Sequence, residues 1–246
     1  MRTLVIGDTH LKFVDIVEKV EETIERWNIK RVVFTGDYCD DWRATEASFE
    51  ADILELADWV EDRREEGLTV DLLFGNHDFQ YLIGEPGPGT MIEEMRFVRD
   101  VLFPLELKIA AVVDDLLITH AGVTQDWADE WLEQTDDIHA IAHDLNAMLE
   151  EGAYDALGTC GPGRGGSDIP SPLWADLAEL TSDPLPNIRQ IVGHTPVGSC
   201  WKAPCDTLDG EPDIWACDTF STTPNLWPIG DGSMLLIKDG VVTVAG

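Results

Sequence analysis

Short apolar runs alternate with amphipathic stretches along the first third of the chain. Thr3–Ile6 and Arg31–Thr35 are rich in β-branched and other apolar residues, and they predict two buried strands. Between them, apolar residues recur at helical spacing from Ile16 to Trp27, with charged residues in the intervening positions. The order strand, amphipathic helix, strand predicts a β-α-β unit.

The same alternation continues further along the chain. The acidic stretch 44–66 predicts a second helix, and Val70–Phe74, Leu116–Thr119 and Ile188–Val192 predict three more strands. Near the end of the sequence, an Asp-Gly turn at 239–240 joins two apolar runs and predicts a β-hairpin, which adds antiparallel strands. The expected class is therefore α/β, with mixed central β-sheet structure flanked by helices.

One long segment, residues 124–183, does not fit this alternation. Its first half has a helical pattern and Cys160–Pro172 is rich in Gly and Pro, so we interpret it as a helical and loop insertion. Loops and insertions of this kind often carry specificity. At 246 residues the chain can bury one substantial core, and we expect a single domain over residues 1–246.

Polar residues that can bind metals follow five of the predicted strands. They occur in five blocks: Gly7-Asp8-Thr9-His10, Gly36-Asp37-Tyr38-Cys39-Asp40, Gly75-Asn76-His77-Asp78, His120-Ala121-Gly122 and Gly193-His194-Thr195-Pro196. Each block alone is a weak signal, because an Asp at a strand end often caps a turn and most histidines bind no metal. Ligands bind at the carboxyl ends of strands in open α/β sheets, so the repetition predicts one shared site. Its oxygen and nitrogen donors suit Mn, Fe or Zn.

The formal net charge of −32, from 48 acidic and 16 basic residues, narrows the range of partners. Nonspecific nucleic-acid binding depends on basic residues that neutralise phosphates, so the charge argues against it. Two interpretations of the charge remain open: a surface adapted to high salt, or an acidic protein from an ordinary host. Because an acidic surface repels anionic substrates, phosphate chemistry would need local cations, and metal ions are a natural source.

The cysteines and the apolar content bear on the compartment. Five cysteines without a Cys-x-x-Cys pair favour reduced intracellular thiols over disulfides or a zinc knuckle. No apolar run approaches the roughly 20 residues that cross a bilayer, so we expect no membrane association. The first ten residues become acidic too early for a signal peptide, and we expect a cytoplasmic protein. The sequence carries no signature of an oligomeric state.

In this order, the five blocks resemble the calcineurin-like metallophosphoesterase superfamily, and the resemblance covers Asp8 to His194. The Gly-His-Thr-Pro block resembles the serine/threonine protein phosphatase branch, which includes small bacterial and phage members and the symmetrical diadenosine tetraphosphatases. Many relatives outside this branch end with Gly-His-x-His. This chain has Pro196 in place of the last His, which favours the phosphatase branch.

The resemblance implies a calcineurin-like metallophosphoesterase fold and two divalent metal ions, with Mn preferred and Fe, Zn or Ni as alternatives. The implied ligands of the first ion are Asp8, His10 and Asp37. Those of the second are Asp37, Asn76, His120 and His194, so that Asp37 bridges both ions. Two cations about 4 Å apart lower the pKa of a bridging water, and the resulting hydroxide attacks phosphorus without a covalent phosphoenzyme.

The resemblance also assigns two residues to the leaving group. His77 would protonate the leaving oxygen, and Asp40 would orient the His77 imidazole. The plainer alternative for Asp40 is a turn cap.

The phosphate clamp departs from the resemblance. Protein phosphatases of this branch carry an Arg directly after Gly-Asp-x-x-Asp, whereas this chain has Asp41. Arg164, which lies between two glycines, is the preferred substitute because Arg binds phosphate through a bidentate fork. Arg43 is a second candidate, with an ordinary surface position as its alternative.

The sequence thus predicts a metal-dependent phosphoesterase whose partner is a phosphorylated substrate, either a phosphoprotein or a nucleotide. The first hypothesis is a phosphomonoesterase that acts on phosphoserine or phosphothreonine in proteins. The second is a nucleotide hydrolase that cleaves a diadenosine polyphosphate or a phosphodiester. Loss of the usual Arg weakens the first hypothesis, because monoesters carry more negative charge than diesters. A binding scaffold without activity is the third hypothesis, and the intact set of ligands argues against it.

Other residues have plainer interpretations. His139 and His143 have a spacing found in zinc sites, but no third ligand is evident, and we expect an ordinary helix face. Asp218-Thr219 resembles the Asp-Thr that follows the last metal-binding His in this branch, so Asp218 is expected to support the site without binding metal. Six tryptophans could line a substrate groove, but we expect most of them in the core; they are Trp127, Trp131, Trp174, Trp201, Trp215 and Trp227.

Overall fold

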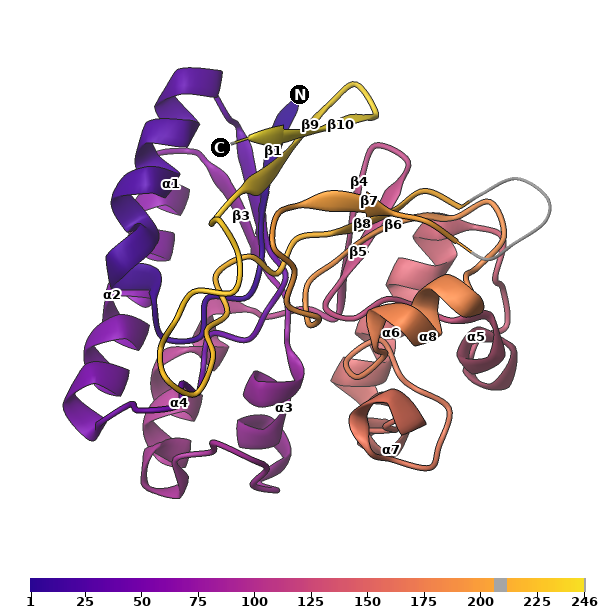
Figure 1. Ribbon diagram of the computed structural model, residues 1–246, viewed down its shortest axis with the longest axis horizontal. Helices are drawn as coiled ribbons and strands as arrows, with labels where there is room; N and C mark the ends of the chain where they lie inside the picture. Colours follow the sequence, from indigo (N-terminus) through magenta and orange to yellow (C-terminus); the bar gives the residue numbers. More distant parts are fainter. Residues whose placement is uncertain (206–211, 246) are drawn as a thin grey trace.

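Two five-stranded sheets form the centre of the structure, a computed structural model that describes residues 1–205 and 212–245 (Figure 1). The strand order is β10-β9-β1-β2-β3 in the first sheet and β4-β5-β6-β8-β7 in the second. The strands are β1 (Arg2–Ile6), β2 (Arg31–Phe34), β3 (Thr69–Leu72), β4 (Ala110–Val113), β5 (Leu116–Thr119), β6 (Arg189–Val192), β7 (Trp201–Ala203), β8 (Ile214–Ala216), β9 (Met234–Lys238) and β10 (Val241–Ala245).

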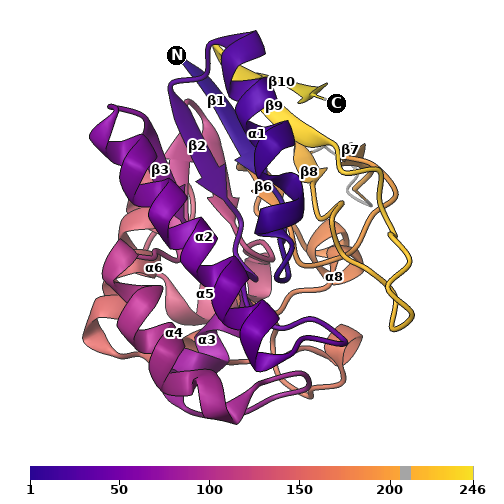
Figure 2. The same cartoon turned by 90° about the vertical axis from the view of Figure 1, so that its left-hand side faces the viewer.

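Helices lie on the outer side of each sheet. The first two helices cover the first sheet, and the helices of segment 124–183 lie beside the second (Figures 1 and 2). The α-helices are α1 (Phe13–Trp27), α2 (Glu46–Glu65), α3 (Asn76–Ile83), α4 (Met95–Val101), α5 (Gln125–Trp131), α6 (Ile138–Glu151), α7 (Tyr154–Leu157) and α8 (Leu177–Ser182). The described residues also form the 3₁₀ turns η1 (Ile92–Glu94), η2 (Phe103–Leu105) and η3 (Pro162–Arg164). No described helix is both long and apolar enough to cross a membrane.

The pleat of β1 divides its apolar side chains between two cores. Leu4 and Ile6 pack with residues of α1 and α2, such as Val20. Val5 points the other way and belongs to a second cluster that includes Ile118 of β5 and Ile191 of β6. Because successive side chains of a strand point to opposite faces, this division follows directly from the uninterrupted apolar sequence of β1. The result is a four-layer arrangement of helices, sheet, sheet and helices.

The strands that precede the polar blocks run parallel to one another within each sheet. β1, β2 and β3 are parallel, and so are β5, β6 and β8, whereas β9 and β10 join the first sheet antiparallel. The carboxyl ends of the two parallel sets meet. The contact is visible in the backbone N–H of His194, after β6, which donates to Asp8 Oδ2, after β1, at 2.8 Å. The two sheets therefore present their polar blocks to one place.

The five predicted strands and the carboxyl-terminal hairpin are present. The hairpin turn uses positive φ angles at Asp239 (53°) and Gly240 (74°), as expected of an Asp-Gly turn. The sequence pattern missed β4, β7, β8 and the helices α3, α4 and α8. β7 and β8 are only three residues long, too short to show a periodicity.

The prediction that most of the six tryptophans lie in the core is wrong. Of these six, Trp127 is fully buried, Trp174 and Trp215 are half-buried, and the other three are exposed. Trp201 lies on the edge strand β7 and Trp227 lies in a loop, so no further layer covers either ring. Local hydrophobicity does not specify whether a neighbouring layer exists.

Candidate metal-binding active site

The carboxyl ends of β1 and β2 bring three predicted ligands together. Asp8 follows β1, Asp37 follows β2, and His10 lies two residues beyond Asp8. Ligand atoms of these three side chains lie within 4.8 Å of one another. His10 and Asp37 have φ angles of 42° and 52°, in the left-handed region that residues other than Gly seldom occupy. Such backbone strain is typical of functional sites.

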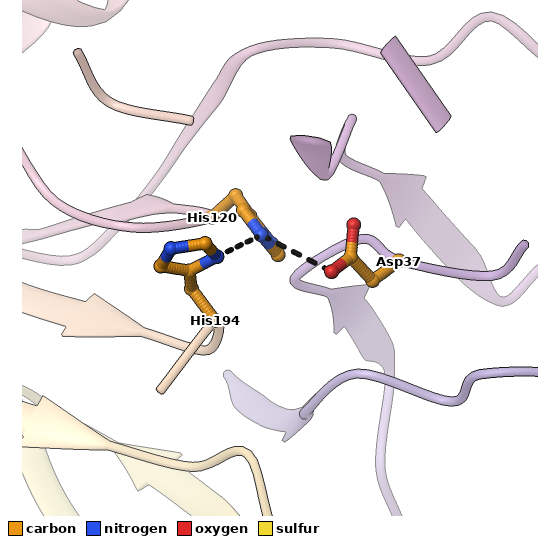
Figure 3. Close-up of side chains that lie close together, drawn as sticks. All are labelled: Asp37, His120 and His194. Carbon is orange, nitrogen blue, oxygen red and sulfur yellow. Dashed lines mark hydrogen bonds and ion pairs between the residues drawn. The ribbon is translucent and has the colours of Figure 1, made fainter. Parts of the chain in front are cut away.

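A second group shares Asp37 with the first. Asp37, His120 and His194 also have ligand atoms within 4.8 Å of one another (Figure 3). His120 Nε2 lies 3.5 Å from Asp37 Oδ2, 3.0 Å from His194 Nδ1 and 3.0 Å from Asn76 Oδ1. The structure therefore brings all six predicted ligands together in two groups, with Asp37 in both.

The tautomers of His10 and His120 place an unprotonated ring nitrogen in this cluster. His120 Nδ1 lies 2.9 Å from the carbonyl oxygen of Thr35, and His10 Nδ1 lies 3.0 Å from that of Asp40. A carbonyl oxygen can only accept, so each Nδ1 carries the proton and each neutral ring directs the lone pair of Nε2 at Asp37. Burial is the main cause that lowers the pKa of both imidazoles to about 3, which keeps them neutral.

The carboxylates are crowded as well as buried. Burial, followed by the charges of Asp218 and Asp37, raises the pKa of Asp8 well above its ordinary value. Burial, followed by the charge of Asp78, does the same to the pKa of Asp37. Asp218 lies outside both ligand groups, where its carboxylate accepts hydrogen bonds from the N–H and the hydroxyl of Ser221.

These observations fit two divalent cations. Lone pairs of imidazoles, carboxylates and an amide converge without a cationic side chain in either ligand group, and His194 Nε2 is buried without a hydrogen bond to a described residue. Cations would relieve the repulsion between the lone pairs and would favour ionised carboxylates. Nitrogen and oxygen donors without a thiolate suit Mn, Fe or Zn.

Two glycines allow the strand ends to approach closely. A Cβ atom on Gly75 would lie 2.0 Å from Asp37 Oδ1, and a Cβ atom on Gly193 would lie 2.0 Å from Asp8 Oδ1. Any side chain at either position would displace a carboxylate of the cluster. Glycine is therefore required at these two positions because a side chain would collide with a carboxylate, and not because the backbone has a positive φ angle.

Asp78 fixes the loop that carries Asp37, a role that the sequence analysis did not assign. Its buried carboxylate accepts hydrogen bonds from the backbone N–H groups of Asp37 at 2.7 Å, Tyr38 at 2.9 Å and Gly75 at 3.0 Å. Its place in the first turn of α3 was the available signal, because carboxylates there receive free backbone donors.

His77, Asp40 and Tyr81 form a chain of hydrogen bonds beside the cluster. His77 Nδ1 lies 2.9 Å from Asp40 Oδ2, and the Tyr81 hydroxyl donates to Asp40 Oδ1 at 2.6 Å. The Tyr81 oxygen in turn accepts from the N–H of Met91 at 2.9 Å. The pairing of His77 with Asp40 has the predicted geometry. Tyr81 lies one helical turn after His77 on α3, and no sequence signal singled it out.

A cavity of about 650 Å³ opens over these residues. Of the predicted site residues, those that line it are His10, Asp37, Asp40, Asn76, His77, Arg164 and His194. Apolar side chains, among them Trp42, Met91 and Trp174, form part of its wall. The cluster, the His77 pair and a substrate-sized space therefore coincide.

The two candidate arginines have different positions. Arg164 lines the cavity, where its Nη2 donates to the carbonyl oxygen of His194 at 3.2 Å and to Thr195 Oγ1 at 2.9 Å. Its Nε lies 3.2 Å from Asp176 Oδ2. Arg43 is exposed and is not among the residues that line the cavity. Lys12 does line it, although the sequence analysis did not select it.

His139 and His143 lie apart from the cluster. Both are exposed on α6, as expected of a helix face, and neither belongs to a group of metal-binding side chains among the described residues. Cys39, Cys160, Cys200 and Cys217 are free thiols in the part of the chain that the structure describes, and the expectation of reduced intracellular thiols stays a prediction.

Comparisons with known proteins concern the family and the fold of the chain. The family model for calcineurin-like phosphoesterases matches residues 1–209. A cold-active protein-tyrosine phosphatase of a psychrophilic Shewanella species is similar in structure, with a TM-score of 0.58, 16% identity, and coverage of 99% of this chain and 80% of the other. A protein serine/threonine phosphatase from Saccharomyces cerevisiae has a TM-score of 0.54, 16% identity and coverage of 99% and 79%. No curated protein matches the sequence significantly.

The chain therefore belongs to the calcineurin-like phosphoesterases. The family match identifies it as a metal-dependent phosphoesterase, and the two similar structures share the fold that the five sequence blocks predicted.

Proposed function

We propose that the protein is a phosphatase that hydrolyses phosphate monoesters, with phosphoserine or phosphothreonine in proteins as the substrate class. The observation that carries this proposal is the position of His77, which lines the cavity together with the ligand cluster and is held by Asp40. A cytoplasmic location is part of the proposal, and five cysteines without a Cys-x-x-Cys pair favour it.

Six residues would hold the metal ions. Asp8, His10 and Asp37 form one group, and Asp37, Asn76, His120 and His194 form the other. When bound, two divalent ions supply Lewis acidity, which neutralises the phosphoryl oxygens and activates water.

The chain's own residues handle the leaving group. His77 Nδ1 is engaged with Asp40 Oδ2, so His77 Nε2 is the atom that can deliver a proton to the leaving oxygen. The bond between phosphorus and that oxygen breaks as a bond from phosphorus to a water oxygen forms, and the leaving group takes the His77 proton and departs as a neutral alcohol. Inorganic phosphate is the second product. The proton that the water loses passes to solvent, from which His77 is protonated again. Asp40 keeps the tautomer correct and stabilises the protonated imidazole. Arg164 would bind the phosphoryl oxygens, and Arg43 would require a movement towards the cavity to do so.

A nucleotide hydrolase is the second candidate, and the apolar wall of the cavity favours it. Trp42 and Trp174 both line the cavity and could stack on a base. This candidate predicts hydrolysis of a dinucleoside polyphosphate or a phosphodiester.

Hydrolysis of p-nitrophenyl phosphate and of bis(p-nitrophenyl) phosphate, each measured with Mn, tests the proposal. We expect the monoester to be the better substrate by kcat/KM and Asp37→Asn to be inactive on both. Phosphopeptides and dinucleoside polyphosphates are then compared under the same conditions, at low and at high salt. A preference for the diester or the dinucleotide would favour the second candidate. Inactivity on every substrate with Mn, Fe, Zn and Ni would leave only a binding scaffold.

A further inference from the structure

The cavity contains few positive charges. Among the described residues that line it, Lys12 and Arg164 are the only lysine or arginine, whereas three aspartates line it: Asp37, Asp40 and Asp41. A monoester dianion that enters this cavity meets acidic side chains in a chain of net charge −32. Each cation in the lining is therefore a candidate for direct contact with the phosphoryl group.

Lys12 is held at the edge of the ligand cluster. It follows His10 and Leu11, both with positive φ angles, at the turn that leads into α1. Its Nζ donates to the carbonyl oxygen of His10 at 2.9 Å and lies 3.6 Å from Asp41 Oδ1. An ammonium group has three N–H donors, of which one bonds to His10 and a second faces the Asp41 carboxylate. One donor thus remains for a ligand.

Asp41 is itself held in place. One of its oxygens, Oδ1, accepts a hydrogen bond from the backbone N–H of Trp42 at 2.7 Å and lies 3.5 Å from Thr222 Oγ1. The indole N–H of Trp42 donates to the carbonyl oxygen of Thr222 at 2.8 Å. Asp41, Trp42 and Thr222 all line the cavity, so this network fixes an acidic partner for Lys12 within the wall.

We infer that Lys12, positioned by Asp41, binds the phosphoryl group together with Arg164 and gives the site its preference for monoesters over diesters. Lys12 donates to a terminal phosphoryl oxygen through an N–H that the protein leaves free, while Asp41 keeps the ammonium group beside His10. A diester has fewer charged terminal oxygens, so it gains less from a second cation. The inference rests on the proposed phosphatase function and adds a residue that determines its specificity.

Substitution of Lys12 tests the inference. We expect Lys12→Met to lower kcat/KM for p-nitrophenyl phosphate about 10- to 100-fold, which corresponds to one hydrogen bond to a charged group. Lys12→Arg should recover most of the loss, and kcat/KM for the bis ester should change by no more than about threefold. Lys30 is exposed, so Lys30→Met removes the same charge away from the cavity and serves as the matched control.

A second arm uses the proximity of positions 12 and 41. The double variant Lys12→Met/Asp41→Arg places a cation near the position that the Lys12 ammonium group occupies in the wild type. We expect its kcat/KM for p-nitrophenyl phosphate to be higher than that of Lys12→Met. Equal losses on monoester and diester, or unchanged kinetics in Lys12→Met, would overturn the inference.

Binding of inorganic phosphate separates this inference from the proposed function. Calorimetry on Mn-loaded wild type and Lys12→Met, each with its metal content measured, should show binding weakened about 10- to 100-fold in the variant at equal metal content. If the wild type hydrolyses neither ester, the proposed function fails, yet the phosphate measurement still decides the role of Lys12. Equal affinity in the two proteins overturns the inference whether or not the enzyme is active.

Discussion

Tyr81→Phe removes a single oxygen atom from the support of His77. In the wild type this oxygen donates to Asp40 Oδ1 at 2.6 Å and accepts from the N–H of Met91 at 2.9 Å, and Tyr81 is fully buried. A hydrogen bond to a charged group contributes about 1.5–3 kcal/mol and a neutral one about 0.5–1.5 kcal/mol. Since water in the adjoining cavity can replace part of the loss at Asp40, we expect the free energy of unfolding to fall by about 2–3 kcal/mol.

The same substitution should reduce catalysis. Asp40 loses one of the two groups that fix its carboxylate, so the imidazole of His77 is held less firmly, and we expect kcat on an alkyl phosphate to fall about tenfold. Urea unfolding gives the stability, and steady-state kinetics well below the unfolding transition give kcat. Tyr38→Phe is the matched control, because the buried Tyr38 hydroxyl has no hydrogen bond to a described residue and its removal should be neutral or slightly stabilising. Equal effects in the two variants, or an unchanged kcat in Tyr81→Phe, would refute this reasoning.

Three further substitutions test other parts of the site and fold. His77→Asn should lower kcat on an alkyl phosphate by at least about 100-fold. The loss of kcat on p-nitrophenyl phosphate should be much smaller, because its leaving group departs as an anion and needs no proton. Equal losses on the two substrates would contradict proton transfer by His77. Gly75→Ala, whose Cβ would meet Asp37 Oδ1 at 2.0 Å, should abolish Mn binding in calorimetry, whereas Gly198→Ala, which has open space, should bind normally. Asp71→Asn should destabilise the protein by about 1–3 kcal/mol at pH 7 in urea unfolding, because Arg31 Nε and Lys108 Nζ each lie 2.7 Å from its carboxylate. Burial alone would raise the pKa of Asp71, but Lys108 and Arg31 outweigh it and lower the pKa. The stabilisation is therefore present above the ordinary Asp pKa of about 3.9 and is lost as the pH falls through the lower pKa of the folded protein. A stability difference between wild type and Asp71→Asn that persists undiminished into acid would contradict the pairing.

The ends of the parallel strands could be predicted from sequence because the signal there is local. An apolar run such as Thr3–Ile6 can only be a buried strand or a short helix segment, and the polar residue that ends it must leave the core. This reasoning located Asp8, Asp37, Asn76, His120 and His194, which the structure brings together. It failed for β7 and β8, whose three residues form strands only because β6 is there to pair with β8.

The contacts of the cavity wall depend on residues far apart in the sequence. Lys12 lies near Asp41, Trp42 bonds to Thr222 across 180 positions, and Tyr81 reaches back to Asp40. None of these pairs shares a helix face or a strand register, so no periodicity relates them. The sequence favoured Arg164 over Arg43 because of its flanking glycines, and packing showed that Arg164 lines the cavity and Arg43 does not.

The sequence by itself determined which donor atoms this protein offers and that they follow strands, because hydrophobic periodicity and chain order are local properties. The tertiary structure decided how those atoms face one another. Two separate sheets had to pack with their carboxyl ends together before the N–H of His194 could reach Asp8 and the imidazole of His120 could reach Asp37. Burial on both faces then removed water from the carboxylates and imidazoles, and this desolvation, which no single segment specifies, makes the cluster suited to cations.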